Sequence, residues 1–388
     1  MNLFFAVSIF LGGGYAALLL YYGYCWKSLP ELGALDGGRH ATENGLPLIS
    51  VIIPARNEAA HLPGLLTSLQ KQALAPEYFE VIVVDDFSSD NTAAIARSFK
   101  GVHCICLQDV LGNKVINSYK KKAIETGIAH SKGSLIVTTD ADCMVGTYWL
   151  QTIAHYYNTY QPVMMVMPVA IAPVKKPIEI FQALDFLSLQ GITGAAAYKN
   201  VLSMCNGANL AYSRKAFDAV NGFEGIDHIA SGDDMLLMHK MVRRFPGKIA
   251  YIKSSAVLVN TAPVATVAQF MRQRIRWASK ADKYEDKRIF WVLLLVYLFN
   301  VSLLAGWILY FMALLTKSIF VPWQIPVLML AAKTIFELLF LMPVATFFGQ
   351  QRLLWFFPVA QPFHILYTVL AGWLGKMGRY QWKDRQVK

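Results

Sequence analysis

Four long stretches with little or no charge constrain this chain more than any other feature of its sequence. The first covers residues 1–26, and Lys27 is the first charged residue. A second covers the 28 residues of 289–316, and two more span roughly 323–348 and 353–374. About 20 apolar residues suffice for a helix to cross a bilayer, where only helices and closed barrels satisfy every backbone group. The sequence therefore predicts a membrane protein with one helix at its start and about three near its end.

The composition agrees with this prediction. Of the 388 residues, 55% are hydrophobic and 16% are charged, and the mean hydropathy is +0.38, which is too apolar for an ordinary soluble enzyme. The net charge of +11 comes from basic residues near the apolar stretches, which favours anionic membrane surfaces over nucleic acid. The five cysteines show neither metal-site spacing nor a disulfide framework.

The flanking charges predict the orientation of the chain. Lys27 and Arg39 follow the first stretch, and because cytoplasmic loops are rich in Lys and Arg, we expect the next domain in the cytosol, below the cell (inner) membrane. Three crossings near the end would then leave the basic tail, residues 377–388, outside, against the same rule. Either one stretch is re-entrant, with Pro358 and Pro362 marking the last as the one to break, or the tail is an exception. We expect three crossings.

From residue 48 to 262 the pattern changes to that of a soluble domain. Apolar, β-branched runs that read as buried strands alternate with helical spacing. The expected strands are 49–55, 79–86, 103–107 and 134–140, and the expected helices are 57–72, 92–99 and 118–130. This alternation predicts an α/β domain with a parallel, doubly wound sheet and right-handed crossovers. No glycine-rich fingerprint follows the first strand, which argues against a Rossmann-type dinucleotide site.

The second half of this domain is less regular. We expect a strand at 163–171, a helix at 178–189, a glycine-led turn into a strand at 206–214, and a helix at 231–244. In the last of these, Ser231 is the expected N-cap, and Asp233 and Asp234 fall in the first turn. Acids at a helix N-terminus are favourable in themselves, so this position alone assigns them no function.

Two carboxylates follow the fourth strand, Asp140 and Asp142, separated by one alanine. In an extended segment, residues two apart point to the same side, so both would aim at one spot past the carboxyl end of the strand. Ligands bind at that edge of open α/β sheets. Two oxygen ligands at one point suit Mg²⁺ or Mn²⁺, and the alternative for an isolated pair of this kind is a solvated turn.

A basic segment separates the soluble domain from the last apolar stretches. Residues 263–288 carry seven basic residues between Arg272 and Arg288, interspersed with apolar ones, which suits an amphipathic helix in the membrane interface. The helices of residues 289–376 then follow. Within them Lys333 and Glu337 stand four apart, so they either snorkel at a helix end or form a polar wall inside the bundle. We favour the wall.

Six short motifs occur in one order along the chain. They are PARNE (54–58), VVDDFSSD (83–90), TTDADC (138–143), NGAN (206–209), SGDD (231–234) and QRIRW (273–277). In this order the sequence resembles the membrane-bound family 2 inverting glycosyltransferases, which have the GT-A fold. That group includes ceramide-glucosyltransferase-like enzymes and the synthases of cellulose, chitin, hyaluronan and poly-N-acetylglucosamine. The resemblance covers about residues 48–280 and the flanking membrane segments.

The resemblance implies roles for the donor side. Pro54, Ala55, Glu58 and Asp86 would line the uracil and ribose of a UDP-sugar, and Lys121 would reach the nucleotide. Asp140 and Asp142 would hold the divalent metal on the diphosphate, with Asp142 the more direct ligand. Such a metal neutralises charge that grows on the leaving UDP.

The resemblance also implies roles for the acceptor side. Asp234 would be the general base that takes a proton as the acceptor hydroxyl attacks, and Asp233 stands where many relatives have Glu, which leaves the choice between the two open. Gln273 and Arg276 would contact the diphosphate, and Trp277 would stack near the acceptor sugar. Interfacial anchoring is the alternative for these last three residues.

The expected function is therefore transfer of a sugar from a UDP-sugar to a membrane lipid, which makes a glycolipid. A processive polysaccharide synthase is the main alternative, because QRIRW (273–277) is also typical of processive members of this group. A non-catalytic membrane partner that binds a nucleotide or lipid is the second alternative. Such a partner would be expected to have lost a carboxylate of the metal or base positions, and this chain retains them all.

Overall fold

The computed structural model describes residues 2–33, 45–112, 114–199, 204–230, 232–279, 286–316, 323–377, 380–382 and 385–387. The chain forms two compact units. The bundle unit consists of Met1–Ser28, Val174–Ala195 and Pro263–Tyr380, and the sheet unit consists of Leu29–Pro173, Ala196–Ala262 and Gln381–Lys388. The predicted domain of residues 48–262 is thus divided, since 174–195 groups with the apolar helices.

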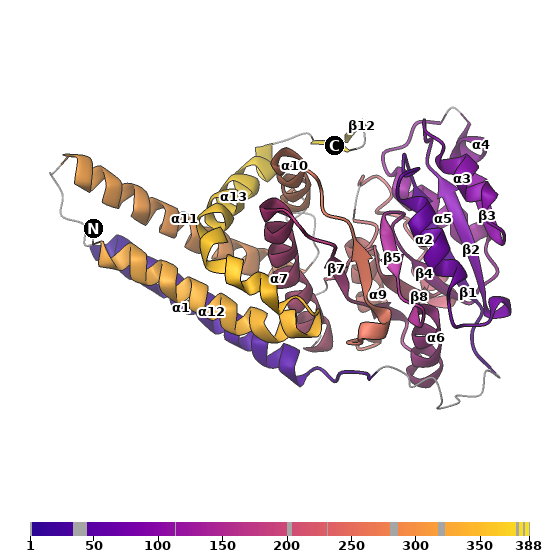
Figure 1. The fold of residues 1–388 in the computed structure, drawn as a ribbon, viewed down its shortest axis with the longest axis horizontal. Coiled ribbons are helices and arrows are strands. Elements are labelled where there is room, and N and C mark those ends of the chain that lie inside the picture. The colour runs from indigo at the N-terminus through magenta and orange to yellow at the C-terminus, as the bar shows by residue number, and fades with distance from the viewer. Residues whose placement is uncertain are drawn as a thin grey trace. The chain divides into compact units, whose positions relative to one another are not determined.

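A seven-stranded sheet is the core of the sheet unit (Figure 1), with the strand order β3-β2-β1-β4-β8-β6-β9. Its strands are β1 (Ile49–Ala55), β2 (Phe79–Asp85), β3 (Val102–Cys106), β4 (Leu135–Thr138), β6 (Met164–Val166), β8 (Leu210–Ser213) and β9 (Ile249–Tyr251). Strands β1 to β4 each begin and end within two residues of their predicted bounds. Almost every residue of β1 and β4 is buried, as expected of strands covered on both faces.

The sheet is mixed, so the prediction of a parallel sheet was wrong for one strand. Strand β1 pairs in parallel with β2 and β4, and β2 pairs in parallel with β3. Strand β8 runs antiparallel to both β4 and β6. Its first residue, Leu210, pairs with Thr138, the last residue of β4, so the chain enters β8 at the edge where β4 ends and must run back. An apolar run carries no sign of its direction.

A smaller sheet with the order β5-β10-β7 adjoins the large one, and its strands are β5 (Cys143–Val145), β7 (Val169–Ile171) and β10 (Val259–Thr261). The single strand predicted at 163–171 is in fact two strands, β6 and β7, in different sheets. Pro168 lies between them, and since proline has no backbone N–H to donate, the pairing of β6 cannot continue through it.

Helices connect these strands, at α2 (Leu62–Gln70), α3 (Thr92–Ser98), α4 (Leu107–Leu111), α5 (Tyr119–His130), α6 (Trp149–Tyr160), α8 (Arg214–Ala219) and α9 (Met235–Arg244), with short 3₁₀ turns η1 (Pro76–Tyr78) and η2 (Ser255–Val257). Helix α2 begins later than predicted. Asn57 has a left-handed backbone (φ 52°), and the backbone N–H groups of His61 and Leu62 donate to the Glu58 carbonyl in a turn. The polar start of the predicted helix is therefore a loop.

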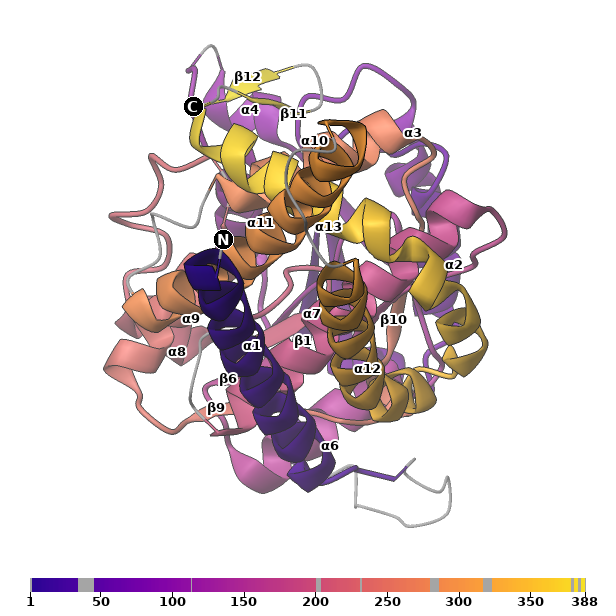
Figure 2. The ribbon, with the colours of Figure 1, turned by 90° about the vertical axis from the view of Figure 1, so that its left-hand side faces the viewer.

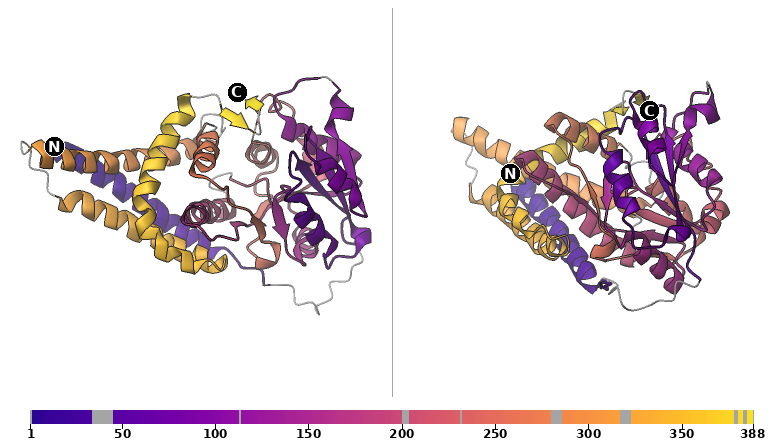
Figure 3. Two further views of the ribbon diagram at one scale, coloured as in Figure 1. Left: turned by 45° about the horizontal axis from the view of Figure 1, so that its top comes forward. Right: turned by 45° about the vertical axis from the view of Figure 1, so that its right-hand side comes forward.

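Four helices of the bundle unit are long and apolar enough to cross a membrane. They are α1 (Asn2–Ser28), α11 (Lys287–Thr316), α12 (Gln324–Phe347) and α13 (Phe357–Met377), the last preceded by the 3₁₀ helix η4 (Gln351–Phe356). Helix α1 packs along α12 and α11 (Figure 2), and α13 crosses the other bundle helices (Figure 3). Helix α13 begins at Phe357, just before Pro358, and continues through Pro362, so Pro362 does not break the last segment.

Two further helices belong largely to the bundle unit. Helix α7 (Pro177–Lys199) is longer than the predicted 178–189, and α10 (Val267–Ala278) is shorter than the predicted amphipathic segment. Thr266 and Gln269 form a capping box at the start of α10, which satisfies backbone donors that a helix otherwise leaves free. At the end of the chain, β11 (Tyr380–Trp382) pairs with β12 (Arg385–Val387).

Lys333 and Glu337 face the inside of the bundle, as predicted. The Lys333 Nζ lies 2.7 Å from Glu337 Oε1, and the two residues are 1% and 6% exposed. Gln361 and Tyr15 donate further hydrogen bonds to the Glu337 carboxylate, and Lys333 also donates to the Gln361 carbonyl oxygen at 2.7 Å. Three helices of the bundle thus meet at one polar cluster.

Candidate active site

Strands β1, β2 and β4 end side by side at one edge of the large sheet (Figure 1). Ala55 ends β1 and is buried, and Pro54 before it is half-buried. Asp85 ends β2, and the backbone N–H of Asp86 donates to the Ala55 carbonyl at 2.8 Å. Since ligands of open α/β sheets bind beyond the carboxyl ends of the strands, this edge is where the predicted donor residues were expected.

Hydrogen bonds join the loops that follow β1 and β2. The Arg56 guanidinium donates to the backbone carbonyls of Asp86 and Phe87, at 2.9 and 3.0 Å. The Glu58 backbone N–H donates to Thr92 Oγ1 at 2.8 Å, and the Glu58 carboxylate lies 3.0 Å from His61 Nδ1. The PARNE loop and the loop after β2 are therefore joined into one surface. Pro54 and Glu58 are half-buried in it, and Ala55 and Asp86 are 1% and 2% exposed.

The turn after β4 differs from the extended geometry that the sequence suggested. Strand β4 ends at Thr138, and the Cys143 backbone N–H donates to the Asp140 carbonyl at 3.1 Å, which closes a turn over residues 140–143. Both carboxylates, Asp140 and Asp142, are half-buried in this turn. Burial and the two nearby carboxylates raise the pKa of the Cys143 thiol, so the thiol stays protonated at neutral pH.

Lys120, on α5, joins two of the predicted carboxylates. Its Nζ lies 2.7 Å from Asp140 Oδ1 and 3.2 Å from Asp233 Oδ2. Burial lowers the pKa of Lys120, but Asp140 and Asp233 outweigh burial and raise the pKa above its usual range. The ammonium group therefore stays charged and ties the turn after β4 to the loop before α9.

Lys121, which was predicted to reach the nucleotide, points elsewhere. It is 2% exposed, and its Nζ donates to the backbone carbonyl of Ile229. Neighbouring residues on a helix point about 100° apart, so only one of the two lysines can face the strand ends. Three lysines, residues 120–122, stand side by side in the sequence, which carries no signal for which of them faces the carboxylates.

The loop before α9 presents Asp233 and Asp234. Ser231 lies outside the described residues, and Asp234 occupies the N-cap position of α9, where its Oδ1 accepts from the Met235 backbone N–H at 2.7 Å. Its Oδ2 accepts from the Gly207 backbone N–H at 3.0 Å. A Cβ on Gly207 would lie 3.1 Å from Asp233 Oδ2, so the close approach of this turn explains the glycine of NGAN.

The residues at this edge fit a divalent metal of the magnesium type. No group of three or more metal-ligating side chains occurs among the residues the structure describes, so zinc-type closed coordination is not supported there. Mg²⁺ and Mn²⁺ commonly use one or two carboxylates and take their other ligands from substrate phosphates and water. The half-buried oxygens of Asp140 and Asp142 match that donor set.

The other predicted site residues lie on α10, in the bundle unit. Gln273, Arg276 and Trp277 are half-buried. The residue between them in the motif, Arg274, is 5% exposed and lies against Asp185 of α7. The segment was predicted to be an amphipathic helix in the membrane interface, but this basic residue is buried inside the bundle unit.

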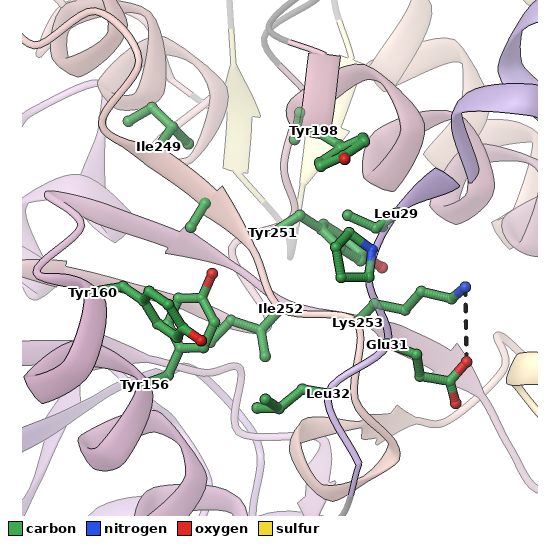
Figure 4. A pocket seen from close by; sticks show the side chains of 13 residues that line it. Leu29, Glu31, Leu32, Tyr156, Tyr160, Tyr198, Ile249, Tyr251, Ile252 and Lys253 are labelled. Atoms are coloured by element: carbon green, nitrogen blue, oxygen red, sulfur yellow. Dashed lines mark ion pairs between the residues drawn. The ribbon is translucent and has the colours of Figure 1, made fainter. Parts of the chain in front are cut away.

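Two open hollows on the sheet unit lie away from these carboxylates. One, of about 340 Å³, is walled by tyrosines, among them Tyr156 and Tyr160, and by the ion pair of Lys253 and Glu31 at 3.7 Å (Figure 4). The other, of about 440 Å³, lies between α2 and the turn after β5. None of the predicted site residues lines either hollow.

Comparison with known proteins agrees with this geometry. Residues 50–220 match the family model described as "Glycosyl transferase family 2". The chain carries a family 2 glycosyltransferase domain. This family 2 domain contains β1, β2, β4 and the turn of Asp140 and Asp142, which confirms the family predicted from the six motifs. The mannosyltransferase PcManGT from Pyrobaculum calidifontis, in complex with GDP-Man and Mn²⁺, has a similar fold (TM-score 0.58, 19% identity, 93% of this chain and 99% of that chain).

Two curated relatives align with part of this chain. One is the 4,4'-diaponeurosporenoate glycosyltransferase of Staphylococcus haemolyticus, 34% identical over 42% of this chain and 42% of the relative. The other is the undecaprenyl-phosphate 4-deoxy-4-formamido-L-arabinose transferase of Aeromonas hydrophila, 37% identical over 25% of this chain and 29% of the relative. The chain therefore spans less than half the length of either relative, and these two matches assign it no particular substrate.

Proposed function

We propose that this protein is an inverting glycosyltransferase that moves a sugar from a UDP-sugar to a membrane lipid acceptor. The observation that carries the proposal is the meeting of Asp140, Asp233, Asp234 and Lys120 beyond the strand ends. An inverting transfer needs a carboxylate that takes a proton and a separate charged site that holds a diphosphate. Here Asp140 and Asp233 come from different loops and share Lys120, and Asp234 follows Asp233 directly in the chain.

On the donor side, the surface that contains Pro54, Ala55, Glu58 and Asp86 would receive the nucleotide. Asp140 and Asp142 would hold Mg²⁺ or Mn²⁺, which supplies positive charge at the leaving diphosphate. The fold neighbour PcManGT carries Mn²⁺ and a nucleotide-sugar, which supports a metal of this class. Lys121 remains a predicted contact by resemblance, but the position of Lys120 makes that residue the better candidate.

On the acceptor side, Asp234 would act as the base and Asp233 as its alternative. The two backbone N–H groups of Met235 and Gly207 fix the Asp234 carboxylate, while each oxygen keeps a further lone pair for an acceptor hydroxyl. Asp233 is already held by Lys120 at 3.2 Å. Gln273 and Arg276 would contact the diphosphate, and Trp277 would stack on the acceptor.

A lipid acceptor is favoured by the four helices that can cross a membrane. A processive synthase must conduct its polymer through the bilayer, whereas these helices suit access from the lipid. The names of the two relatives include undecaprenyl-phosphate and diaponeurosporenoate, both of which are acceptors soluble in lipid. The same proposal places this protein in the cell membrane as a multi-pass protein, with the sheet unit in the cytosol.

The experiment is a transfer assay with the purified full-length protein in nanodiscs. Labelled UDP-sugars and GDP-sugars are offered one at a time with a bacterial lipid extract, and products are separated by thin-layer chromatography. We expect one UDP-sugar to give a lipid carrying one sugar or very few, in Mg²⁺ or Mn²⁺ but not in EDTA. The Asp142→Ala variant should be inactive and folded, and full activity of that variant in EDTA would contradict the metal assignment.

Other outcomes separate the alternatives. A water-soluble polymer of high mass made from the UDP-sugar alone would establish the processive synthase. Activity with a GDP-sugar only would keep the enzyme class and correct the donor. Nucleotide binding with no transfer to any acceptor would favour the non-catalytic partner.

Topology needs a separate test, because the charge rule and three crossings disagree about the tail. Single cysteines are placed after residue 388 and, as a cytosolic reference, at Lys132 of the sheet unit, in a variant without the five native cysteines. A membrane-impermeant thiol reagent is added to intact cells. Labelling of the tail but not of residue 132 would support three full crossings, although the structure groups Gln381–Lys388 with the sheet unit. Protection of both positions would favour a re-entrant segment.

A further inference from the structure

Helix α7 brings a buried acid against the QRIRW helix, inside the bundle unit. Asp185 on α7 is 7% exposed and Arg274 on α10 is 5% exposed. The Arg274 Nε donates to Asp185 Oδ2 at 2.7 Å, and the Tyr367 hydroxyl of α13 donates to Asp185 Oδ1. We call these three residues the Asp185 cluster, and it joins α7, α10 and α13 at one carboxylate.

Arg274 also contacts two residues of the motif in which it stands. Its Nη1 donates to Gln273 Oε1 at 2.7 Å. Its guanidinium lies 4.2 Å from the centre of the Trp277 ring, within the range of a cation–π contact. A single guanidinium thus links Asp185 to both Gln273 and Trp277, and a lysine ammonium has no planar fork to do the same.

A second contact from α7 fixes the start of the same helix. The Gln182 side chain, one turn before Asp185, donates to the Val264 carbonyl and accepts from the Val264 N–H, each at 2.9 Å. Val264 lies just before the capping box of Thr266 and Gln269, where α10 begins. Helix α7 therefore holds the start of α10 through the Val264 backbone and the last turns of α10 through Arg274.

Stability alone does not account for an ion pair at this place. A buried pair replaced by apolar residues of similar volume is often neutral or stabilising, because two charges must lose their water. Apart from His364, whose Nε2 lies 4.0 Å from Asp185 Oδ1, the neighbours of the cluster are apolar and aromatic, with Phe181 and Phe270 in T-shaped contact at 5.4 Å. An apolar pair would fit that setting, but it could not orient a carboxamide.

We propose that Asp185 and Arg274 are positioning residues, which hold the Gln273 carboxamide and the Trp277 ring in the orientation used for substrate. The proposal rests on the function proposed above only where it says that this orientation serves substrate binding. The orientation itself is a property of the bundle unit and can be measured without substrate. Misplacement of a contacting group by about 1 Å can cost roughly 10²-fold in rate, so the effect should appear in turnover.

The first test measures orientation without any assay of function. The full chain is labelled with 5-fluorotryptophan, and Trp277→Phe identifies the Trp277 signal among the nine tryptophans by ¹⁹F NMR. Arg274→Lys should move that signal, whereas the control Arg352→Lys, at an exposed residue of η4, should leave it in place. An unchanged Trp277 signal in folded Arg274→Lys protein would overturn the proposal.

Arg274→Lys leaves a buried carboxylate poorly paired, so a second variant guards against misfolding. Asp185→Asn combined with Arg274→Met removes both charges and keeps the volume, and it should fold. The proposal again requires the Trp277 signal to move. If the protein folds and the signal stays, packing alone holds the ring and Arg274 has no positioning role.

The second test uses kinetics in a double-mutant cycle. Gln273→Ala and Arg274→Lys should each lower kcat about 10–100-fold with KM changed less than about threefold, by the reasoning on misplaced groups. Because Arg274 acts in part through Gln273, the double variant should lose less than the product of the two single losses. Fully additive losses would show that Arg274 acts independently. If wild-type protein transfers no sugar, the proposed function fails, while the ¹⁹F result still decides the orientation.

Discussion

Two lysines in this protein each lie 2.7 Å from a carboxylate, but they differ in burial. Lys333 is fully buried, and its partner Glu337 has a side chain 8% exposed. Lys120 is 22% exposed, and its partner Asp140 is 36% exposed. In the first cluster, Gln361 and Tyr15 take up the remaining capacity of the carboxylate. In the second, water reaches the carboxylate.

The difference separates a cluster that holds helices together from one that can take a ligand. A buried charge must be paired and hydrogen-bonded by the protein itself, since no water replaces a lost partner. A half-exposed carboxylate beside a cation can exchange water for phosphate or metal at small cost. The same residue types therefore serve structure at Lys333 and are available for chemistry at Lys120.

The largest expected effect tests the chemistry of the exposed cluster. Asp234→Asn should lower turnover about 10²–10⁴-fold, the usual range for a lost general base. Asn caps helices as well as Asp does, but its single oxygen can accept from only one of the Met235 and Gly207 N–H groups, so the variant should lose about 1–3 kcal/mol of stability and remain folded. The assay is initial rate at saturating donor, with thermal unfolding in detergent. An inactive Asp233→Asn beside an active Asp234→Asn would reverse the assignment of the base.

The next effect tests the structural role of the buried cluster. Glu337→Ala leaves Lys333 without its carboxylate and should cost about 3–5 kcal/mol in the free energy of unfolding. The matched control is Glu125→Ala, which breaks an ion pair of the same length, 2.7 Å, between exposed side chains. Exposed pairs contribute about 0–1 kcal/mol. Equal losses in thermal or denaturant unfolding for the two variants would mean that burial does not separate the clusters.

A smaller effect is expected at Lys120. Lys120→Met keeps the length of the side chain but removes the charge that joins Asp140 to Asp233. Because the pair is partly exposed, stability should fall by no more than about 1 kcal/mol. Turnover should fall about tenfold, which corresponds to ~1.4 kcal/mol in the transition state. A matched Lys121→Met variant should instead lower stability more than turnover, and the reverse pattern would assign Lys121 to the site.

The smallest effect is expected at Gly207. A methyl group there would lie 3.1 Å from Asp233 Oδ2, so Gly207→Ala should displace that carboxylate by a few tenths of an ångström. We expect a few-fold loss of turnover and about 1 kcal/mol of stability, the low end for overpacking. The control is Gly225→Ala, at a glycine with nothing within contact distance of a Cβ. It should lose stability through its positive φ of 82°, but not turnover.

The sequence was informative where a pattern has a single physical reading. Apolar runs of 20 or more residues become the four long helices, and β-branched runs become β1, β2 and β4. The pairing of Lys333 with Glu337 followed from helical spacing alone. The motifs identified the family because six of them occurred in order.

What the sequence left open depends on contacts between distant segments. The direction of β8 is fixed by where the chain enters the sheet, and the choice of Lys120 over Lys121 is fixed by the rotation of α5. Asp185 gave no signal, because its partner Arg274 is 89 residues away. The turn at Asp140 was predicted to be extended, because nothing in the sequence showed that β4 ends at Thr138, two residues before it.

Most of α7 belongs to the bundle unit although it stands between two segments of the sheet unit. This has a consequence for the synthesis and the truncation of the chain. Strand β8, which follows α7, inserts between β4 and β6, which precede it. During synthesis, β4 and β6 therefore lack β8, the strand that pairs with both of them, until α7 and then β8 have been made. A gene fragment for residues 48–262 alone would include Gln182 and Asp185 without α10 or α13, and would leave that face of α7 bare. Replacing residues 174–195 by a short flexible linker, rather than trimming the termini, is the way to obtain a soluble fragment of the sheet unit, which would lack the α10 residues proposed to contact substrate.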